Sequence, residues 1–195
     1  ALKSQMRQAG AVHHLIPLLN HNQNVKFLAI VVDCLYFLVI GNQEAKTVML
    51  EMGGTQQLIG LLFNHTQQYP KLIQNIIRLL KVLSTCNQNK QAMLSMNAIQ
   101  PLSSHLMTSS AANSQGTSSN SRDIITNCLM ILRNLSDAAT QLTGLAPFIT
   151  GLLSFLSTSQ DPNHIELTAA ILANLTVNEA NKIAAIKSSA IPVLL

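Results

Sequence analysis

The chain has 195 residues, of which 48% are hydrophobic and 10% carry a charge, and its net charge is +4. This composition is typical of a folded chain with a large core, and it excludes an intrinsically disordered protein. The mean hydropathy is positive at +0.28, yet polar residues interrupt every run of about 18 residues, so we expect no membrane insertion.

One short phrase, built around two leucines three residues apart, occurs four times. The leucine pairs are Leu35/Leu38, Leu80/Leu83, Leu132/Leu135 and Leu172/Leu175. Their first leucines are separated by 45, 52 and 40 residues. A period in the low forties with two or three helices per unit is typical of armadillo and HEAT repeats. The predicted fold is therefore all-α, an armadillo-repeat right-handed superhelical solenoid with three helices per repeat.

The first predicted repeat covers residues 1–41 and ends in a long helix from Val25 to Val39. Gly41 and Asn42 close that helix, as these residue types commonly do. The second repeat covers residues 42–87, and Gly53-Gly54 separates its first two helices. Its predicted helices are Lys46–Met52, Gln56–Phe63 and Lys71–Cys86.

The third predicted repeat covers residues 88–139 and contains a Ser/Thr/Asn-rich insertion at 108–121. We expect this insertion to be a flexible loop, because its side chains bury too little apolar area to offset the entropy of ordering. The first two helices are predicted at Lys90–Met96 and Ile99–Met107, and the third is predicted to carry Asp123 in its first turn.

The fourth predicted repeat covers residues 140–178, and residues 179–195 begin a further repeat that is cut short. Helices are expected at Pro147–Leu156 and Ile165–Leu175, with the second preceded by a capping turn at Asp161-Pro162-Asn163. We therefore expect the chain to be part of a longer array.

No motif for catalysis, nucleotide binding or metal binding occurs in the sequence. Cys34, Cys86 and Cys128 are widely spaced, which argues against disulfides or zinc. His164, like the other isolated histidines, has no cysteine or carboxylate at ligand spacing. We therefore predict a non-enzymatic protein with no metal site and no cofactor.

Basic and amide side chains occur at related positions on the third helices and just after them. They are Lys26, Lys46, Lys71, Arg78, Lys81, Lys90, Arg133, Asn134, Asn174 and Lys182. A single lysine is usually a solvated surface charge, and the asparagines could be helix caps or satisfied core amides. As a set they would form a stripe along a concave groove, where amides hold an extended backbone and bases select an acidic peptide.

Five segments carry a resemblance to a known family: Asn24–Ile30, Asp33–Leu35, Gly41–Glu44, Lys81–Ser84 and Leu132–Thr140. They resemble the central armadillo repeats of the beta-catenin family, which includes plakoglobin and Armadillo. The run Arg-Asn-Leu-Ser-Asp-Ala-Ala-Thr that begins at Arg133 is specific to this family.

The resemblance implies a scaffold that binds the acidic tails of cadherins, TCF/LEF factors, APC and Axin in one groove. Lys46 and Lys182 match two lysines that clasp ligand acids. The other groove positions implied are Lys26, Lys71, Arg78, Lys81, Met130, Arg133, Asn134 and Asn174. The resemblance also implies roles in cell adhesion, Wnt signalling and transcriptional co-activation, at cell–cell junctions and in the cytoplasm and nucleus. We expect a monomer that approaches membranes only through cadherin.

Three departures from the family pattern affect this expectation. Met130 replaces a groove tryptophan and Ile40 replaces a groove tyrosine, so aromatic anchors are lost. The insertion at 108–121 is either a spacer or a phosphorylation-sensitive flap.

Two other functions agree less well with the sequence. An importin-alpha-like transport receptor would grip basic peptides, but it needs acids and tryptophans in the groove. Direct nucleic-acid binding is not expected, because the net charge is small and aromatic residues make up only 4%.

Overall fold

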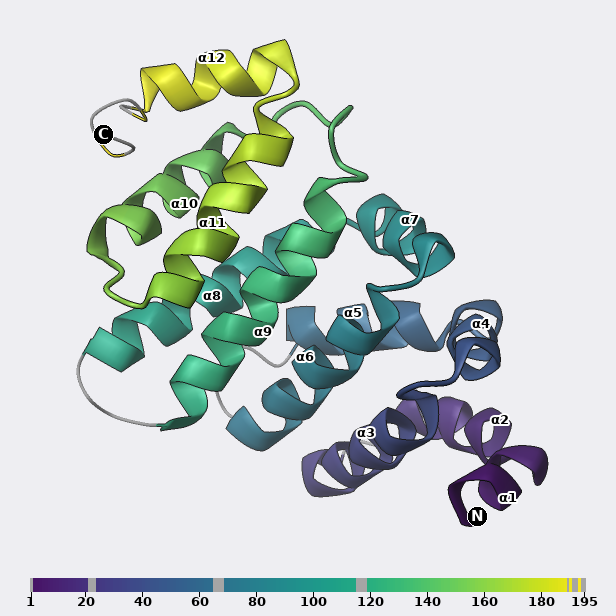
Figure 1. The fold of residues 1–195 in the computed structure, drawn as a ribbon. Helices are drawn as coiled ribbons and strands as arrows, with labels where there is room; N and C mark the ends of the chain where they lie inside the picture. Colours follow the sequence, from purple (N-terminus) through teal and green to yellow (C-terminus); the bar gives the residue numbers. More distant parts are fainter. Residues whose placement is uncertain are drawn as a thin grey trace. The chain divides into compact units, whose positions relative to one another are not determined.

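The computed structural model describes residues 2–20, 24–64, 69–114, 119–188, 190 and 193. Within these residues it is all-helical, with twelve α-helices and one short 3-10 helix (Figure 1). None of the helices in this described part is long and apolar enough to cross a bilayer. The chain divides into two compact units, Ala1–Pro101 and Leu102–Leu195.

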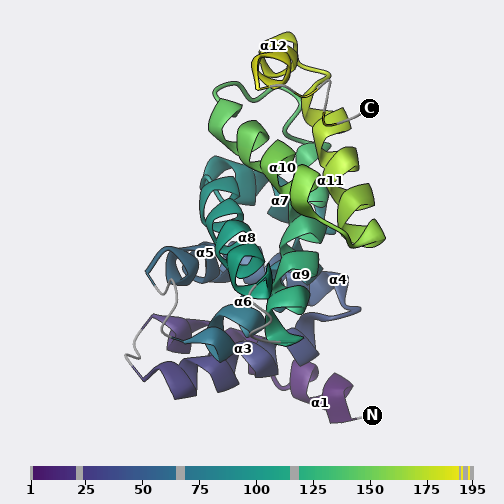
Figure 2. The same cartoon turned by 90° about the vertical axis from the view of Figure 1, so that its left-hand side faces the viewer.

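The first unit contains two sets of three helices and the first helix of another set. The first set is α1 (Leu2–Gln8), α2 (Ala11–Leu15) continued by the 3-10 helix η1 (Ile16–Leu19), and α3 (Val25–Val39). The second set is α4 (Gln43–Glu51), α5 (Gly54–Asn64) and α6 (Pro70–Leu83), and α7 (Asn87–Ser95) follows. Helices α3 and α6 lie side by side and form the main helix contact of this unit (Figures 1 and 2).

The second unit is built on another such pair of long helices. Its elements are most of α8 (Ile99–Ser114), then α9 (Ser119–Ser136), α10 (Ala146–Thr158), α11 (Pro162–Leu175) and α12 (Glu179–Lys187). Helix α11 packs on α9 and on α10, and α12 packs on α10 (Figure 2). The helices follow the predicted order, while the repeat boundaries themselves stay a prediction.

The leucine phrase contributes to the core of both units. All eight of its leucines are buried, with at most 4% of any of them exposed. Burial of a leucine side chain contributes about 1.5–3 kcal/mol. The phrase recurs because every long helix must present this pair to the layer beneath it.

Two buried asparagines connect successive sets of helices, and the sequence did not single them out. Asn89 on α7 donates to the carbonyl oxygen of Lys46 at 3.0 Å and accepts from the Thr55 hydroxyl at 2.7 Å. Asn181 on α12 donates to the carbonyl oxygens of Leu142 and Leu175. Each amide thereby joins its helix to backbone carbonyl groups of residues outside that helix.

The corner between the first and second helices of a set uses the left-handed backbone region. Gly10 and Gly53 have φ values of 75° and 71°, and Asn97 stands at the matching corner with φ 54°. Glycine adopts this conformation without strain, and asparagine is one of the few other residues that tolerate it. The predicted break at Gly53-Gly54 is therefore a sharp corner set by backbone conformation.

The expectation of a flexible loop over residues 108–121 is wrong for most of that segment. Helix α8 continues to Ser114 and α9 begins at Ser119, while residues 115–118 lie outside the described part. Once Leu102 and Leu106 are buried in the core, each further residue extends an existing helix without a new nucleation cost. Because α9 starts early, Asp123 also lies beyond its first turn, contrary to prediction.

Two glycine substitutions test the corner with opposite expected signs. Gly53→Ala should destabilise the chain by about 1–2 kcal/mol, because alanine is strained at positive φ. Gly60 lies inside α5 with open space around its Cα, so Gly60→Ala should stabilise by about 0.5–1 kcal/mol. Urea unfolding measures both, and equal effects of the two substitutions would contradict the assignment.

Candidate functional site

The first unit places two exposed lysines on neighbouring helices. Lys26 lies in the first turn of α3 and Lys71 in the first turn of α6, where Asn24 and Pro70 respectively start the helix. Both lysines line one cavity of about 510 Å³ between the two helices. Neither ammonium group makes an ion pair or hydrogen bond within the described residues. Both charges are therefore available to a ligand.

Arg78, which points from α6 toward α3, is already engaged. Its guanidinium lies 3.3 Å from a carboxylate oxygen of Asp33 and 4.2 Å from the ring centroid of Tyr36. Both members of the ion pair remain partly exposed, at 28% and 38% of their side chains. An acidic ligand must therefore compete with Asp33 for this arginine.

Lys46 is held in place by a neutral partner. Its Nζ donates to the Thr85 hydroxyl at 2.7 Å, and that hydroxyl donates to the carbonyl oxygen of Val82 at 2.8 Å. A hydroxyl orients the ammonium group without neutralising it.

Lys81, one turn after Arg78 on α6, is half-buried.

The second unit arranges its predicted residues on two helices. Met130, Arg133 and Asn134 are three and four positions apart on α9, so they share one helix face. Met130 and Arg133 are exposed and Asn134 is half-buried. Asn174 on α11 donates to the Ser136 hydroxyl at 2.9 Å. This amide thus joins two helices, which is the alternative left open for it.

Lys182 differs from Lys46 in its partner. It lies on α12 and forms an exposed ion pair with Glu179 at 2.8 Å. The two lysines expected to clasp ligand acids are therefore in different states, because one faces a hydroxyl and the other a carboxylate.

Two exposed apolar residues on α3 were missed by the sequence reasoning. Ile30 and Phe37 are 62% and 52% exposed, and they lie seven residues apart on the face that carries Asp33. The sequence could have identified Phe37 as a groove position, because it occupies the same place in its copy of the leucine phrase as Asn134 and Asn174 do in theirs. An apolar stripe thus accompanies the bases in this unit.

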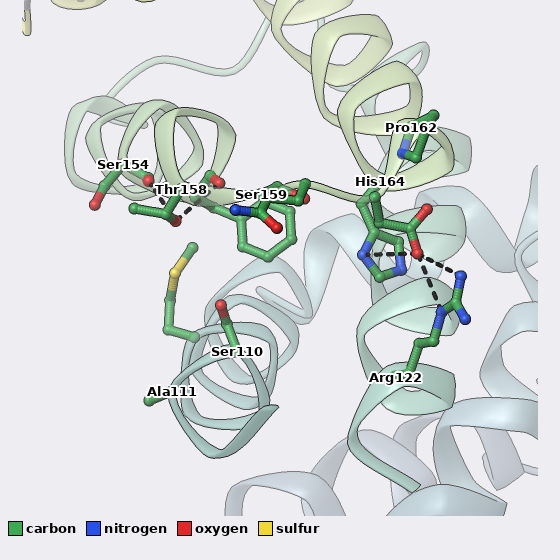
Figure 3. A pocket seen from close by; sticks show the side chains of 12 residues that line it. Ser110, Ala111, Arg122, Ser154, Thr158, Ser159, Pro162 and His164 are labelled. Carbon is green, nitrogen blue, oxygen red and sulfur yellow. Dashed lines mark hydrogen bonds and ion pairs between the residues drawn. The ribbon is translucent and has the colours of Figure 1, made fainter. Parts of the chain in front are cut away.

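A second cavity, of about 930 Å³, lies in the second unit between α8, α10 and the start of α11 (Figure 3). Arg122 on α9 donates through Nε and Nη2 to one carboxylate oxygen of Asp161, at 3.1 and 2.8 Å. The same oxygen lies 3.7 Å from Nδ1 of the buried His164, one turn along the chain. The expectation that His164 has no carboxylate at ligand spacing is therefore wrong.

No trio of histidine, cysteine, aspartate or glutamate in the described part is placed to hold a metal ion. The Arg122 cluster is thus an ion-pair network. Asp161 also starts α11, since its other oxygen accepts from the backbone N–H of Asn163 at 3.0 Å.

Comparison with known proteins places the chain in a family. It is 39% identical to human junction plakoglobin over 194 residues, which cover 99% of this chain and 24% of plakoglobin. It is 38% identical to catenin beta of Urechis caupo over 182 residues, which cover 93% of this chain and 20% of that protein. The chain belongs to the beta-catenin/plakoglobin family and corresponds to part of its armadillo-repeat region.

Solved structures agree with this placement. A structure from a study of a phosphorylation switch controlling the interaction between cadherin and beta-catenin superposes with a TM-score of 0.84 and 32% identity. It covers 98% of this chain, which spans 35% of that chain. A designed armadillo repeat protein matches with a TM-score of 0.75 at 19% identity, which supports the fold alone. No family model matches the chain.

These relatives confirm the predicted family and the armadillo fold. Membership of this family agrees with the prediction of a non-enzymatic protein. The chain spans about a quarter of the length of the plakoglobins it matches, at 24%. The role of the individual groove residues stays a prediction.

The ion-pair network of this armadillo segment shifts two pKa values. Burial lowers the pKa of His164, the nearby charge of Arg122 lowers it further, and Asp161 only partly opposes this. For Asp161, burial acts to raise the pKa, but the hydrogen bond from Arg122, the charge of His164 and the Asn163 N–H outweigh it and lower the pKa. At neutral pH His164 is therefore neutral and Asp161 is ionised.

The pKa of His164 predicts a loss of stability in mild acid. The unfolded chain binds a proton near pH 6.5, more readily than the folded chain does, so stability is complete above that pH and falls as the pH drops below it. Asp161 acts only at lower pH, below about 4. Thermal unfolding between about pH 7.5 and 5.5 should show the decrease.

His164→Gln should flatten this pH dependence, because the amide can still donate to Thr126 but does not titrate. His13→Gln, at an exposed position, is the matched control. An unchanged slope in His164→Gln would contradict the assignment.

Proposed function

We propose that this armadillo segment is a non-enzymatic scaffold that binds extended acidic peptides in a basic groove. The observation that carries the proposal is the pair Lys26 and Lys71. They occupy matching positions on adjacent helices, line one cavity, and lack partners within the described residues. Ligand carboxylates would find two unneutralised charges beside an apolar wall, and charge complementarity then selects acidic partners.

The partners proposed are the acidic tails of cadherins and of TCF/LEF factors, APC and Axin. Family membership supports this, as does the similarity to a beta-catenin structure studied for its interaction with cadherin. In this proposal the protein acts in cell adhesion, Wnt signalling and transcriptional co-activation, at cell–cell junctions, in the cytoplasm and in the nucleus. Membrane proximity would come through cadherin.

A second candidate is an armadillo receptor for basic peptides, of the importin-alpha type. A designed armadillo protein with 18% identity was solved with the basic peptide (KR)4, so the fold can serve that purpose. The charges here oppose it, because Lys26, Lys71, Arg78 and Arg133 occupy the predicted groove and the chain has no tryptophan. Preferential binding of a basic peptide would favour this candidate.

Charge reversal of two predicted groove lysines tests the proposal. Lys26→Glu combined with Lys71→Glu should weaken binding of an acidic cadherin- or TCF-like peptide roughly tenfold or more, since each exposed charge pair contributes up to about 1 kcal/mol. Titration calorimetry at two salt concentrations measures this loss. Lys187→Glu, an exposed lysine at the end of α12, is the control. Equal affinity in the double variant would rule out the mechanism.

Removal of the internal competitor should have the opposite effect. Asp33→Asn leaves Arg78 without its carboxylate partner, so an acidic peptide should bind about two- to fivefold more tightly. Glu51→Gln removes one exposed acid from the end of α4 and serves as the matched control. If both variants gain affinity equally, net charge alone explains the gain and Asp33 has no special role.

A further inference from the structure

The turn between α6 and α7 brings an exposed hydroxyl onto a lysine of the predicted groove. Thr85 lies in this turn, at residues 84–86, and is exposed. Its Oγ1 accepts a hydrogen bond from Nζ of Lys46 at 2.7 Å and donates one to the carbonyl oxygen of Val82 at 2.8 Å. Thr85 and Lys46 are 39 residues apart in the sequence, so the fold creates the contact. A group attached to Oγ1 would therefore lie beside the ammonium group.

The matching turn of the second unit carries a carboxylate at the same position. Ser84 and Ser136 each follow a buried leucine of the leucine phrase, and each hydroxyl donates to the carbonyl oxygen three residues earlier at 2.8 Å. The next residue is exposed in both turns, and it is Thr85 in the first and Asp137 in the second. The local structure of this turn is therefore compatible with a negative charge where Thr85 stands.

The surroundings of Thr85 favour an added negative charge. Lys46 makes no ion pair within the described residues, so its charge is not neutralised. Helix α7 begins at Asn87, two residues after Thr85, and the positive end of its dipole favours an anion there. The Val82 carbonyl at the end of α6 opposes an anion, but a charge-assisted hydrogen bond to an ammonium group is about twice as strong as a neutral one.

We propose that Thr85 is a phosphorylation site, and that its phosphate binds Lys46 and withdraws this lysine from acidic ligands. The inference rests on the proposed function and names a regulation of the same groove. A protein kinase would transfer the γ-phosphoryl group of ATP to Oγ1, so that the bond to the bridging oxygen of ADP breaks as the Oγ1–phosphorus bond forms. The hydroxyl proton passes to the catalytic aspartate of the kinase.

The phosphate changes the electrostatic state of Lys46. It carries a charge of about −1.5 to −2 at pH 7 and three acceptor oxygens, whereas the hydroxyl is neutral. Lys46 would then resemble Lys182, which already faces the carboxylate of Glu179 at 2.8 Å. A ligand acid must displace the phosphate to reach Lys46, and the negative charge that remains nearby repels that acid. Phosphorylation would therefore weaken the binding of acidic peptides.

The first test asks whether the modification occurs. The chain is isolated from the cells that produce it, with phosphatases inhibited, and its phosphorylated residues are mapped by mass spectrometry. We expect Thr85 to carry a phosphoryl group in a fraction of the molecules, and Thr85→Val should remove the corresponding phosphopeptide. Absence of the phosphoryl group from Thr85 would overturn the proposed modification site.

The second test measures the contact with Lys46 without any ligand. In a chain phosphorylated at Thr85, phosphorus NMR follows the second ionisation of the phosphate, whose pKa is ordinarily about 6. The ammonium partner should lower this pKa by about 0.2–0.7, the range of an exposed ion pair, and Lys46→Gln should restore it. An unchanged pKa after Lys46→Gln would overturn the capture of Lys46.

A chain phosphorylated at Ser95 is the matched control for this titration. Ser95 is also exposed, and its hydroxyl donates to the carbonyl oxygen three residues earlier at 2.8 Å. No lysine donates to it within the described residues, so its phosphate should titrate near the ordinary value. An equal decrease at both sites would assign the effect to the net charge of the chain and overturn the contact with Lys46.

The third test links the site to the proposed function. Phosphorylation at Thr85 should weaken the binding of an acidic peptide about two- to fivefold, whereas phosphorylation at Ser95 should leave the affinity unchanged. An equal loss in both forms would overturn the regulation of the groove. If no acidic peptide binds the unmodified chain, the proposed function and this regulation fail together, while the first two tests still decide the phosphorylation of Thr85 and its contact with Lys46.

Discussion

In each unit the two long helices bury their leucines in the core and pack side by side, and the positions of the exposed side chains depend on that pairing. Helix α3 pairs with α6, and α11 pairs with α9. Amide side chains then lock each pair, through Asn75 to the Ala29 carbonyl and Asn174 to the Ser136 hydroxyl. Because these contacts fix the orientation of each helix, they also fix which side chains on its opposite face point outward.

That arrangement places cations in different electrostatic states along the predicted groove. Lys26 and Lys71 have no partner within the described residues, whereas Arg78 and Lys182 already face carboxylates. Only the unpaired group attracts an acidic ligand with its full charge. A base that already has a carboxylate partner must give up that ion pair to bind the ligand. Its net contribution to the binding free energy is the difference between the two ion pairs, which is small at exposed sites. Counting bases along the groove would therefore overstate its attraction for acids.

Much of the fold could be predicted because the leucine phrase repeats with a helical period. The predicted helix Val25–Val39 agrees with α3 at both ends, since Asn24 caps its start and Gly41 follows its end. Residues 108–114 could not be placed from composition, because a packed core propagates a helix into residues that would not start one. The Arg122–Asp161 pair could not be found either, since packing brings together residues that lie 39 apart in the sequence. The repeat predicted which helices carry these bases, but it did not predict the partners of Arg78 and Lys182.

The resident carboxylates of Asp33 and Glu179 have a further consequence for a ligand in the predicted groove. When a ligand acid takes Arg78 or Lys182, the displaced carboxylate stays nearby as an unpaired like charge. A peptide with an acid opposite Asp33 would therefore be penalised, while one that carries a neutral donor there would be accepted. Repulsion of this kind discriminates between partners of equal net charge. Because of Asp33 and Glu179, binding would depend on the spacing of the acidic residues along a peptide tail more than on the number of those residues.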